Sequence, residues 1–179
     1  VNVFIRDIGH VSKRAAGRIP QRILLVLDLL ESPLDVIEKP ERIKDLLFPD
    51  DILPPDISRS TLEANLEILA RPEGIALVMT DELLFSPGSS ELSESARVLL
   101  EQIYSVLLYL DINVNIAGHT DTTVGFEQDN LELSSERAIA VLAFFLQNEI
   151  RQERFSISSY GGYWPIADNG TEDGRRRNR

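Results

Sequence analysis

The chain has 179 residues, of which 43% are hydrophobic and 26% charged, a globular composition with room for one ordinary domain or two small ones. Its net charge of -11 is unevenly distributed, because residues 1–22 hold five basic side chains and one acid, and residues 175–179 hold four arginines. The stretch 23–174 carries 9 basic and 28 acidic groups, a net charge of -19. Because this stretch is so acidic, it excludes a broad nucleic-acid-binding surface, since phosphate binding needs a positive face.

Several other classes are excluded by what the sequence lacks. The chain has no cysteine, which rules out disulfide scaffolds, thiolate zinc sites, iron–sulfur clusters and cysteine nucleophiles. Its longest strongly apolar run, residues 23–30, is far shorter than the roughly 20 residues of a membrane-spanning helix. The chain begins at Val1 rather than methionine, so we expect a longer protein in which a signal peptide or membrane anchor can precede it.

Residues 1–57 form a first segment to which the sequence assigns no function. Alternating apolar residues at Val1, Val3 and Ile5 predict a short strand. The apolar run 23–30 has no capping residue and favours a buried strand, and the proline- and aspartate-rich stretch 47–57 indicates an extended linker. Because so short a segment rarely folds alone, we expect it to pack on the remainder of the chain.

Residues 58–179 form the second predicted unit. Ser60 and Glu63 match a capping box at the start of a short helix that continues through Leu69. Strands are expected at 75–80, 83–85, 113–117 and 155–159, with a long helix after Ser93 and another through residues 138–145. This order predicts an α+β fold, a two-layer sandwich with the helices packed on a mixed β-sheet.

The residues with the clearest chemical potential follow the predicted strand 113–117. Gly118 ends that strand, Asp121 lies in the next loop, and Arg137 belongs to the following helix. If Ser134 caps that helix, Arg137 lies in its first turn, where a cation opposes the helix dipole and free N–H groups favour anions. Asp121 and Arg137 can pair with each other; as a site, they would hold the ammonium and the carboxylate of a zwitterionic amino-acid head group.

Ordered motifs across residues 75–179 carry a family resemblance. They are Gly118-His119-Thr120-Asp121, Asn130-x-x-Leu133-Ser134-x-x-Arg137-Ala138, Phe85-x-x-Gly88-Ser89-x-x-Leu92, and the ending from Tyr160-Gly161 to Asn178-Arg179. The sequence resembles the OmpA-like peptidoglycan-binding domain, and within that family it is most similar to MotB-type flagellar stator proteins.

The resemblance implies noncovalent binding of meso-diaminopimelate in the peptidoglycan stem peptide. Asp121 would take its ammonium and Arg137 its carboxylate, and the pocket would be lined by Thr120, Asn130, Leu133 and Phe85. The spacing from Asp121 to Arg137 is one residue longer than we expect for the family, so the loop 122–129 must bulge, and the family continues into a further strand after Arg179.

The resemblance also implies the setting of the molecule. We expect a periplasmic, homodimeric module of a Gram-negative bacterium that anchors a membrane protein or complex to the cell wall through a membrane partner outside this chain. No nucleic acid, cofactor or metal is expected. Three alternatives stay open. They are an outer-membrane-tethering wall anchor of the OmpA/Pal type, a wall-modifying enzyme or its regulator, and a structural adaptor whose residues 1–57 bind a protein partner.

Catalytic interpretations of the same residues are weaker. His119 and Asp121 provide too few ligands for a metal site, and nothing supplies Ser134 with a nucleophile elbow or an oxyanion hole. We therefore expect no enzymatic activity.

The remaining polar and aromatic groups are interpreted structurally. Trp164, with Tyr160 and Tyr163, can stack on a sugar, but we favour a role in covering a core edge. The acidic pair Asp81-Glu82 is interpreted as a turn and surface feature, and the basic residues Arg14 and Arg18 as solvated charge.

Overall fold

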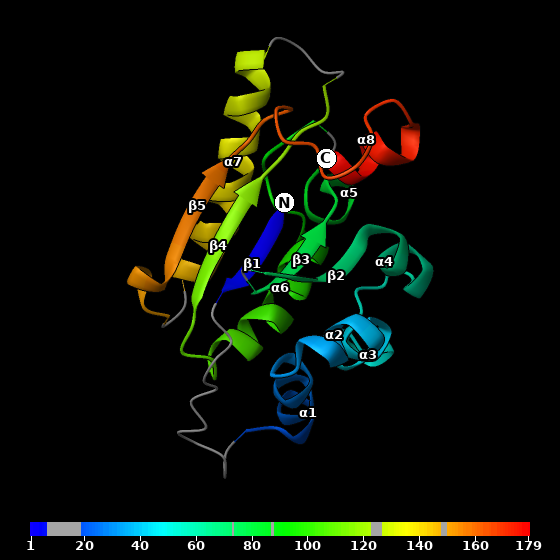
Figure 1. Ribbon diagram of the computed structural model, residues 1–179, viewed down its shortest axis with the longest axis vertical. Coiled ribbons are helices and arrows are strands. Elements are labelled where there is room, and N and C mark those ends of the chain that lie inside the picture. Colours follow the sequence, from blue (N-terminus) through cyan, green and yellow to red (C-terminus); the bar gives the residue numbers. More distant parts are fainter. Residues whose placement is uncertain (7–18, 73, 87, 123–126, 148–149) are drawn as a thin grey trace.

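The computed structural model describes residues 1–6, 19–72, 74–86, 88–122, 127–147 and 150–179, and shows helices packed on one mixed sheet (Figure 1). The strand order is β2-β3-β1-β4-β5; β4 and β5 run parallel, and the other neighbours are antiparallel. The strands are β1 (Asn2–Arg6), β2 (Leu66–Arg71), β3 (Gly74–Met79), β4 (Asn113–Gly118) and β5 (Phe155–Ser159). The predicted α+β class is confirmed.

The central strand of the sheet comes from the beginning of the chain. β1 pairs with β3 on one side, with Val3 opposite Leu77, and with β4 on the other, with Val3 opposite Ile116. The N and C marks lie close together in Figure 1. The predicted division between residues 57 and 58 stays a prediction, although β1 shares one sheet with the second unit.

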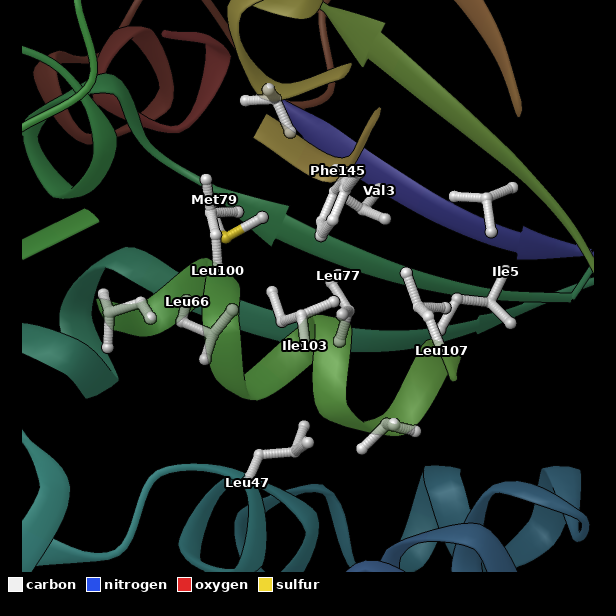
Figure 2. Packing of buried hydrophobic residues seen from close by; sticks show 14 of the residues in the cluster. Val3, Ile5, Leu47, Leu66, Leu77, Met79, Leu100, Ile103, Leu107 and Phe145 are labelled. Atoms are coloured by element: carbon white, nitrogen blue, oxygen red, sulfur yellow. The ribbon is translucent and has the colours of Figure 1, made fainter. Parts of the chain in front are cut away.

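The core lies between the sheet and the helices α6 (Glu94–Leu107) and α7 (Glu127–Leu146). The hydroxyl of Ser93 accepts a hydrogen bond from the Ala96 N–H at 3.0 Å, so the predicted cap of α6 is confirmed. Figure 2 shows Ile103 of α6 beneath Leu77 of the sheet and Leu100 of α6 beneath Met79, and each of these side chains is at most 2% exposed. Burial of such apolar side chains is favourable and holds α6 against the sheet.

Residues 21–47 form three helices, α1 (Gln21–Leu30), α2 (Pro33–Glu38) and α3 (Pro40–Leu47). The predicted buried strand at 23–30 is therefore wrong. Ile23, Val26, Leu27 and Leu30 are buried at spacings of three and four, whereas Asp28 is exposed, which is the pattern of an amphipathic helix. The predicted linker is also more structured than expected, since η1 (Asp50–Ile52) forms within it and its apolar residues Leu47, Phe48 and Ile57 are buried.

Three shorter elements also differ from expectation. Helix α4 (Arg59–Asn65) is capped by Ser58 rather than Ser60, and it ends at Asn65 because the next residues form β2. The spacing of Leu62, Leu66 and Leu69 fits a helix, but Leu66 and Ile68 also alternate with Glu67 as a strand requires. Residues 81–84 form the one-turn helix α5 (Asp81–Leu84) instead of a strand end.

The other face of the sheet is crossed by the segment after β5. The chain passes through η2 (Gln152–Arg154) and β5, then turns back toward α8 (Glu172–Asn178), whose Arg177 pairs with Glu67 of β2 at 2.8 Å. Asn178 has no exposed surface, and its amide holds the segment in place. Its Oδ1 accepts hydrogen bonds from the Ile166 and Ala167 N–H groups at 2.7 and 2.8 Å, and its Nδ2 donates to the Ala167 carbonyl at 2.8 Å.

Candidate functional site

The end of β4 is pressed against α7 at Gly118. A Cβ atom on Gly118 would lie 1.9 Å from the Ser134 carbonyl oxygen, so only glycine fits there. The Ser134 hydroxyl has no exposed surface and contacts the Leu131 carbonyl, the Ser159 hydroxyl and the Gly161 N–H at 3.0, 2.6 and 3.1 Å. Ser134 therefore fastens α7 to β5 and to the turn after β5.

Helix α7 begins at Glu127, seven residues before the predicted cap. Ser134 is consequently not an N-cap, and the expectation that Arg137 lies in the first turn beside free N–H groups is wrong. Arg137 projects from the middle of α7, where the helix dipole has little local effect. The predicted bulge in the loop 122–129 falls mostly on residues 123–126, which lie outside the described residues.

Asp121 and Arg137 are the two buried members of a cluster of four charges. Asp121 has no exposed surface, and its Oδ2 accepts a hydrogen bond from the Nη1 of Arg179 at 2.8 Å. Arg137 is 3% exposed, and its Nη2 lies 3.3 Å from the Oδ2 of Asp81. The Nε of Arg179 lies 3.7 Å from the other oxygen of Asp81, so the two pairs are joined into one network.

The surroundings of Arg137 hold its guanidinium in one place. Its Nε donates to the Ser89 carbonyl at 3.2 Å, and its Cζ lies 5.1 Å from the centroid of the Phe85 ring. Burial lowers the pKa of the Arg137 guanidinium from its ordinary value, and the carboxylate of Asp81 opposes that change. The side chain keeps its charge because arginine stays protonated far above neutral pH.

The other predicted pocket residues lie on the same elements. Thr120 precedes Asp121 and is 4% exposed, and its hydroxyl makes no hydrogen bond with the part of the chain that the structure describes. Asn130 is 6% exposed in α7, and Leu133 lies one turn before Arg137 and is half-buried. Phe85 contacts Arg137 directly. The structure thus brings the predicted residues to one end of the sheet, and their role with a ligand stays a prediction.

Two charged members of the cluster were not predicted from the sequence. Asp81 was expected at the surface, but its side chain is only 17% exposed and pairs with Arg137. Arg179 was recognised as part of a motif without being placed beside Asp121. One signal was available for Arg179, because the ending Asn178-Arg179 belongs to the same set of motifs as Asp121.

The arrangement suits recognition of a small molecule that carries both signs of charge. The two guanidinium groups can hold a carboxylate through paired N–H donors, and the two carboxylates can accept an ammonium. Within the described ranges, no three His, Asp or Glu side chains gather as a metal ion would require. No helix in the described part of the chain is long and apolar enough to cross a membrane.

This geometry defines the class of the protein: a two-layer α+β domain that carries a charge cluster beside its central strands. A model of the OmpA family matches residues 84–179, more than half of the chain. The chain therefore belongs to the OmpA family, and the resemblance predicted from the motifs is confirmed.

Relatives and solved structures agree with this assignment. Motility protein B of Bacillus subtilis is 30% identical over 128 residues, which cover 69% of this chain and 49% of that protein. The crystal structure of the periplasmic domain of Helicobacter pylori MotB has a TM-score of 0.57 at 26% identity, covering 64% of this chain and 74% of that one. A MotB-like protein from Desulfovibrio vulgaris shares the fold, with a TM-score of 0.64 at 24% identity over 87% of this chain and 94% of that one. The chain spans about half the length of the Bacillus relative.

Proposed function

We propose that the chain binds peptidoglycan noncovalently through the meso-diaminopimelate of the stem peptide. The single observation that carries this proposal is the charge-balanced cluster of Asp121, Arg179, Asp81 and Arg137, of which Asp121 and Arg137 are buried. The free end of a diaminopimelate side chain carries one ammonium and one carboxylate on the same carbon. It therefore matches a site that offers both signs of charge within a few ångströms.

The burial of the cluster explains why such a ligand would be selected. Removing a charge from water is costly unless an opposite charge replaces the water, so a buried cluster favours ligands that keep its sum neutral. A zwitterion does so, whereas a simple amine or a simple acid adds an uncompensated charge. Because Asp121 has no exposed surface and Arg179 is 32% exposed beside it, the ligand's ammonium would replace Arg179 on Asp121. Arg179 could then join Arg137 on the ligand's carboxylate.

Wall binding would make the chain an anchor rather than an enzyme. The Helicobacter relative is described as a periplasmic domain, and we infer the same compartment for this chain. A membrane partner outside the chain would then be held against the wall, as in a flagellar stator, with two copies acting together. This function uses the site to hold a ligand and requires no bond to be made or broken.

The test is co-sedimentation of the purified chain with isolated sacculi. Asp121→Asn removes the charge at constant size, and Arg137→Lys keeps the charge but removes the planar fork and its contact with Phe85. Truncating or neutralising one member of a buried charge pair typically costs about 2–5 kcal/mol, so each variant should bind at least roughly 30-fold more weakly.

A matched control uses the exposed ion pair between Arg151 and Asp111, which lies outside the cluster. Asp111→Asn and Arg151→Lys make the same chemical changes and should leave sacculus binding unaltered. Binding by Asp121→Asn and Arg137→Lys at the wild-type level, with the fold intact by circular dichroism, would refute the site.

A further inference from the structure

The face of the sheet opposite α6 and α7 carries a cavity, separate from the charge cluster. Its volume is about 510 Å³, within the range of roughly 300–1,000 Å³ that small-molecule sites occupy. Its floor is made by side chains of the central strands, among them Asn2 of β1, Val78 of β3 and Asn115 of β4. Its wall is made by the segment after β5, including Tyr160, Trp164 and Pro165.

The wall presents an aromatic platform at the surface. The indole of Trp164 is 71% exposed, which is unusual for the largest apolar side chain, so the expected role in covering a core edge is wrong for this residue. The backbone of Trp164 is held by its carbonyl, which lies 3.2 Å from the Nδ1 of His119, and its ring meets Tyr160 edge-on at 6.0 Å. An exposed indole offers a flat surface on which an apolar ring face can stack.

The floor supplies hydrogen-bonding groups beside that platform. The Nε2 of His119 pairs with the Nδ2 of Asn2 at 3.2 Å, and Nδ1 lies beside the Trp164 carbonyl, so a neutral ring with its proton on Nδ1 satisfies both contacts. Asn2 is 3% exposed, and among the described residues nothing donates a hydrogen bond to its Oδ1. A buried acceptor without a donor is costly, and a ligand hydroxyl or amide N–H would satisfy it if the Asn2 side chain turned toward the cavity, since its Oδ1 has almost no accessible surface.

Charge narrows the class of ligand further. In the described part of the lining, Arg71 is the one ionised side chain, and no carboxylate takes part. The cavity therefore combines apolar walls, amide and imidazole groups and a stacking surface, with little fixed charge. Saccharides match this combination, because a pyranose ring has apolar C–H faces and a rim of hydroxyl groups that both donate and accept.

The cavity and the charge cluster share one turn of the chain. The Thr120 N–H donates to the Gly161 carbonyl at 2.9 Å, and a Cβ on Gly162 would lie 3.3 Å from the carbonyl oxygen of Asp121. His119 faces the cavity and Asp121 the cluster, with only Thr120 between them in sequence. A polymer whose peptide reaches Asp121 can therefore present its sugars to Trp164.

We propose that this cavity is a subsite for N-acetylated glycan, with Trp164 as the stacking platform and Asn2 and Asn115 as polar contacts. The identity of the sugar rests on the proposed function, since the glycan strand of peptidoglycan carries the stem peptide that the charge cluster would bind. The two sites together would recognise a glycan strand and its peptide at once, and each would strengthen the other through effective concentration.

The experiment uses two probes that separate the two sites. One is a peptide-free tetrasaccharide of alternating N-acetylglucosamine and N-acetylmuramic acid, and the other is a sugar-free stem tripeptide ending in meso-diaminopimelate. Trp164 is the only tryptophan in the chain, so its fluorescence reports directly on the cavity. The tetrasaccharide should shift that emission saturably. By calorimetry, Trp164→Ala should weaken tetrasaccharide binding about tenfold and leave tripeptide binding unchanged.

Tyr163→Ala is the matched control, because Tyr163 is 62% exposed in the same turn but does not line the cavity. It should bind the tetrasaccharide as the wild type does, and Trp164→Phe should retain part of the affinity. Absence of tetrasaccharide binding by the wild type, or equal losses in Trp164→Ala and Tyr163→Ala, would overturn the subsite. Tetrasaccharide binding without tripeptide binding would leave the subsite standing and count against the proposed function.

Discussion

Arg179 donates a hydrogen bond to the fully buried carboxylate of Asp121 at 2.8 Å, so two residues 58 positions apart in the sequence form the centre of the charge cluster. Through this contact, the residue that follows α8 becomes part of the charge cluster. Arg179 supplies a cation beside a carboxylate that has no exposed surface, and a buried carboxylate without a partner would be strongly disfavoured.

The pairing predicts coupled effects on stability. Asp121→Asn and Arg179→Gln should each lower the free energy of unfolding, and the double variant should lower it by about 1 kcal/mol less than the two single changes together. Urea unfolding of the four proteins measures this coupling. The exposed pair Arg151 and Asp111 is the comparison, with a coupling below about 0.5 kcal/mol. Strict additivity for Asp121 and Arg179 would show that they do not interact in solution.

The contact between β4 and α7 predicts a severe effect of a single methyl group. Gly118→Ala would place Cβ 1.9 Å from the Ser134 carbonyl oxygen, so the helix must move or the strand end must distort. We expect a loss of at least about 3 kcal/mol in the free energy of unfolding. Gly170→Ala is the control, since its Cβ meets only the flexible carboxylate of Asp168 at 3.1 Å, and its loss should stay below about 1 kcal/mol. Similar losses in the two variants would contradict the close approach.

How far the sequence predicts this fold depends on whether one periodicity dominates a segment. Helix α6 and the strands β4 and β5 were predicted because each has a clear repeat and, for α6, a capping residue at Ser93, whereas β3 was predicted from a short continuous apolar run. The run 23–30 was wrongly predicted as a strand because nearly all of its residues are apolar, so the helical spacing of the buried ones does not stand out in the sequence. The boundary between α4 and β2 could not be placed, since Leu62, Leu66 and Leu69 fit a helix while Leu66, Glu67 and Ile68 fit a strand, and only pairing with β3 decides between them.

Only part of the candidate site could be predicted from the sequence. The motifs identified Asp121, Arg137 and Phe85, which the structure places at one end of the sheet. It did not show that Arg179 pairs with Asp121 or that Asp81 pairs with Arg137, because these contacts depend on where α5 and α8 pack. The start of α7 at Glu127 also could not be read from Ser134, whose hydroxyl is used between elements rather than as a cap.

The environment of His119 predicts a pH dependence of stability. Burial lowers the pKa of the His119 imidazole from 6.5 to about 4, and the hydrogen bond with the Trp164 carbonyl opposes that change. The folded state therefore favours the neutral ring. The stability this contributes is fully present above pH 6.5 and is lost as the pH falls from 6.5 to about 4, where the unfolded chain binds a proton that the folded chain does not.

Comparison with His119→Gln isolates this contribution from that of the carboxylates. Between about pH 7 and about pH 4.5, the wild type should lose roughly 2 kcal/mol more unfolding free energy than the variant. Denaturant unfolding at several pH values supplies the measurement. A difference between the two proteins that does not change with pH would mean that His119 titrates normally.

Because the amide of Asn178 anchors the segment that forms the wall of the cavity, we expect its loss to loosen that segment locally. Asn178→Ala removes the hydrogen bonds to Ile166, Ala167 and Asn169 and should cost about 2–3 kcal/mol of stability. Hydrogen exchange should accelerate at the Ile166 and Ala167 amides before the strands are affected. Asn178→Asp keeps the acceptor for both amides and should protect them better than the alanine variant. Equal protection in all three proteins would contradict the anchoring role.

The most direct test of the proposed wall-binding site is calorimetric titration of the chain with two stem tripeptides. One ends in meso-diaminopimelate, and the other carries L-lysine in its place, which keeps the terminal ammonium but lacks the neighbouring carboxylate. If Arg137 and Asp121 bind a zwitterion, the diaminopimelate peptide should bind at least about 30-fold more tightly than the lysine peptide, since charge-assisted contacts to the carboxylate are lost. Equal affinities, or no binding of either peptide, would contradict the claim.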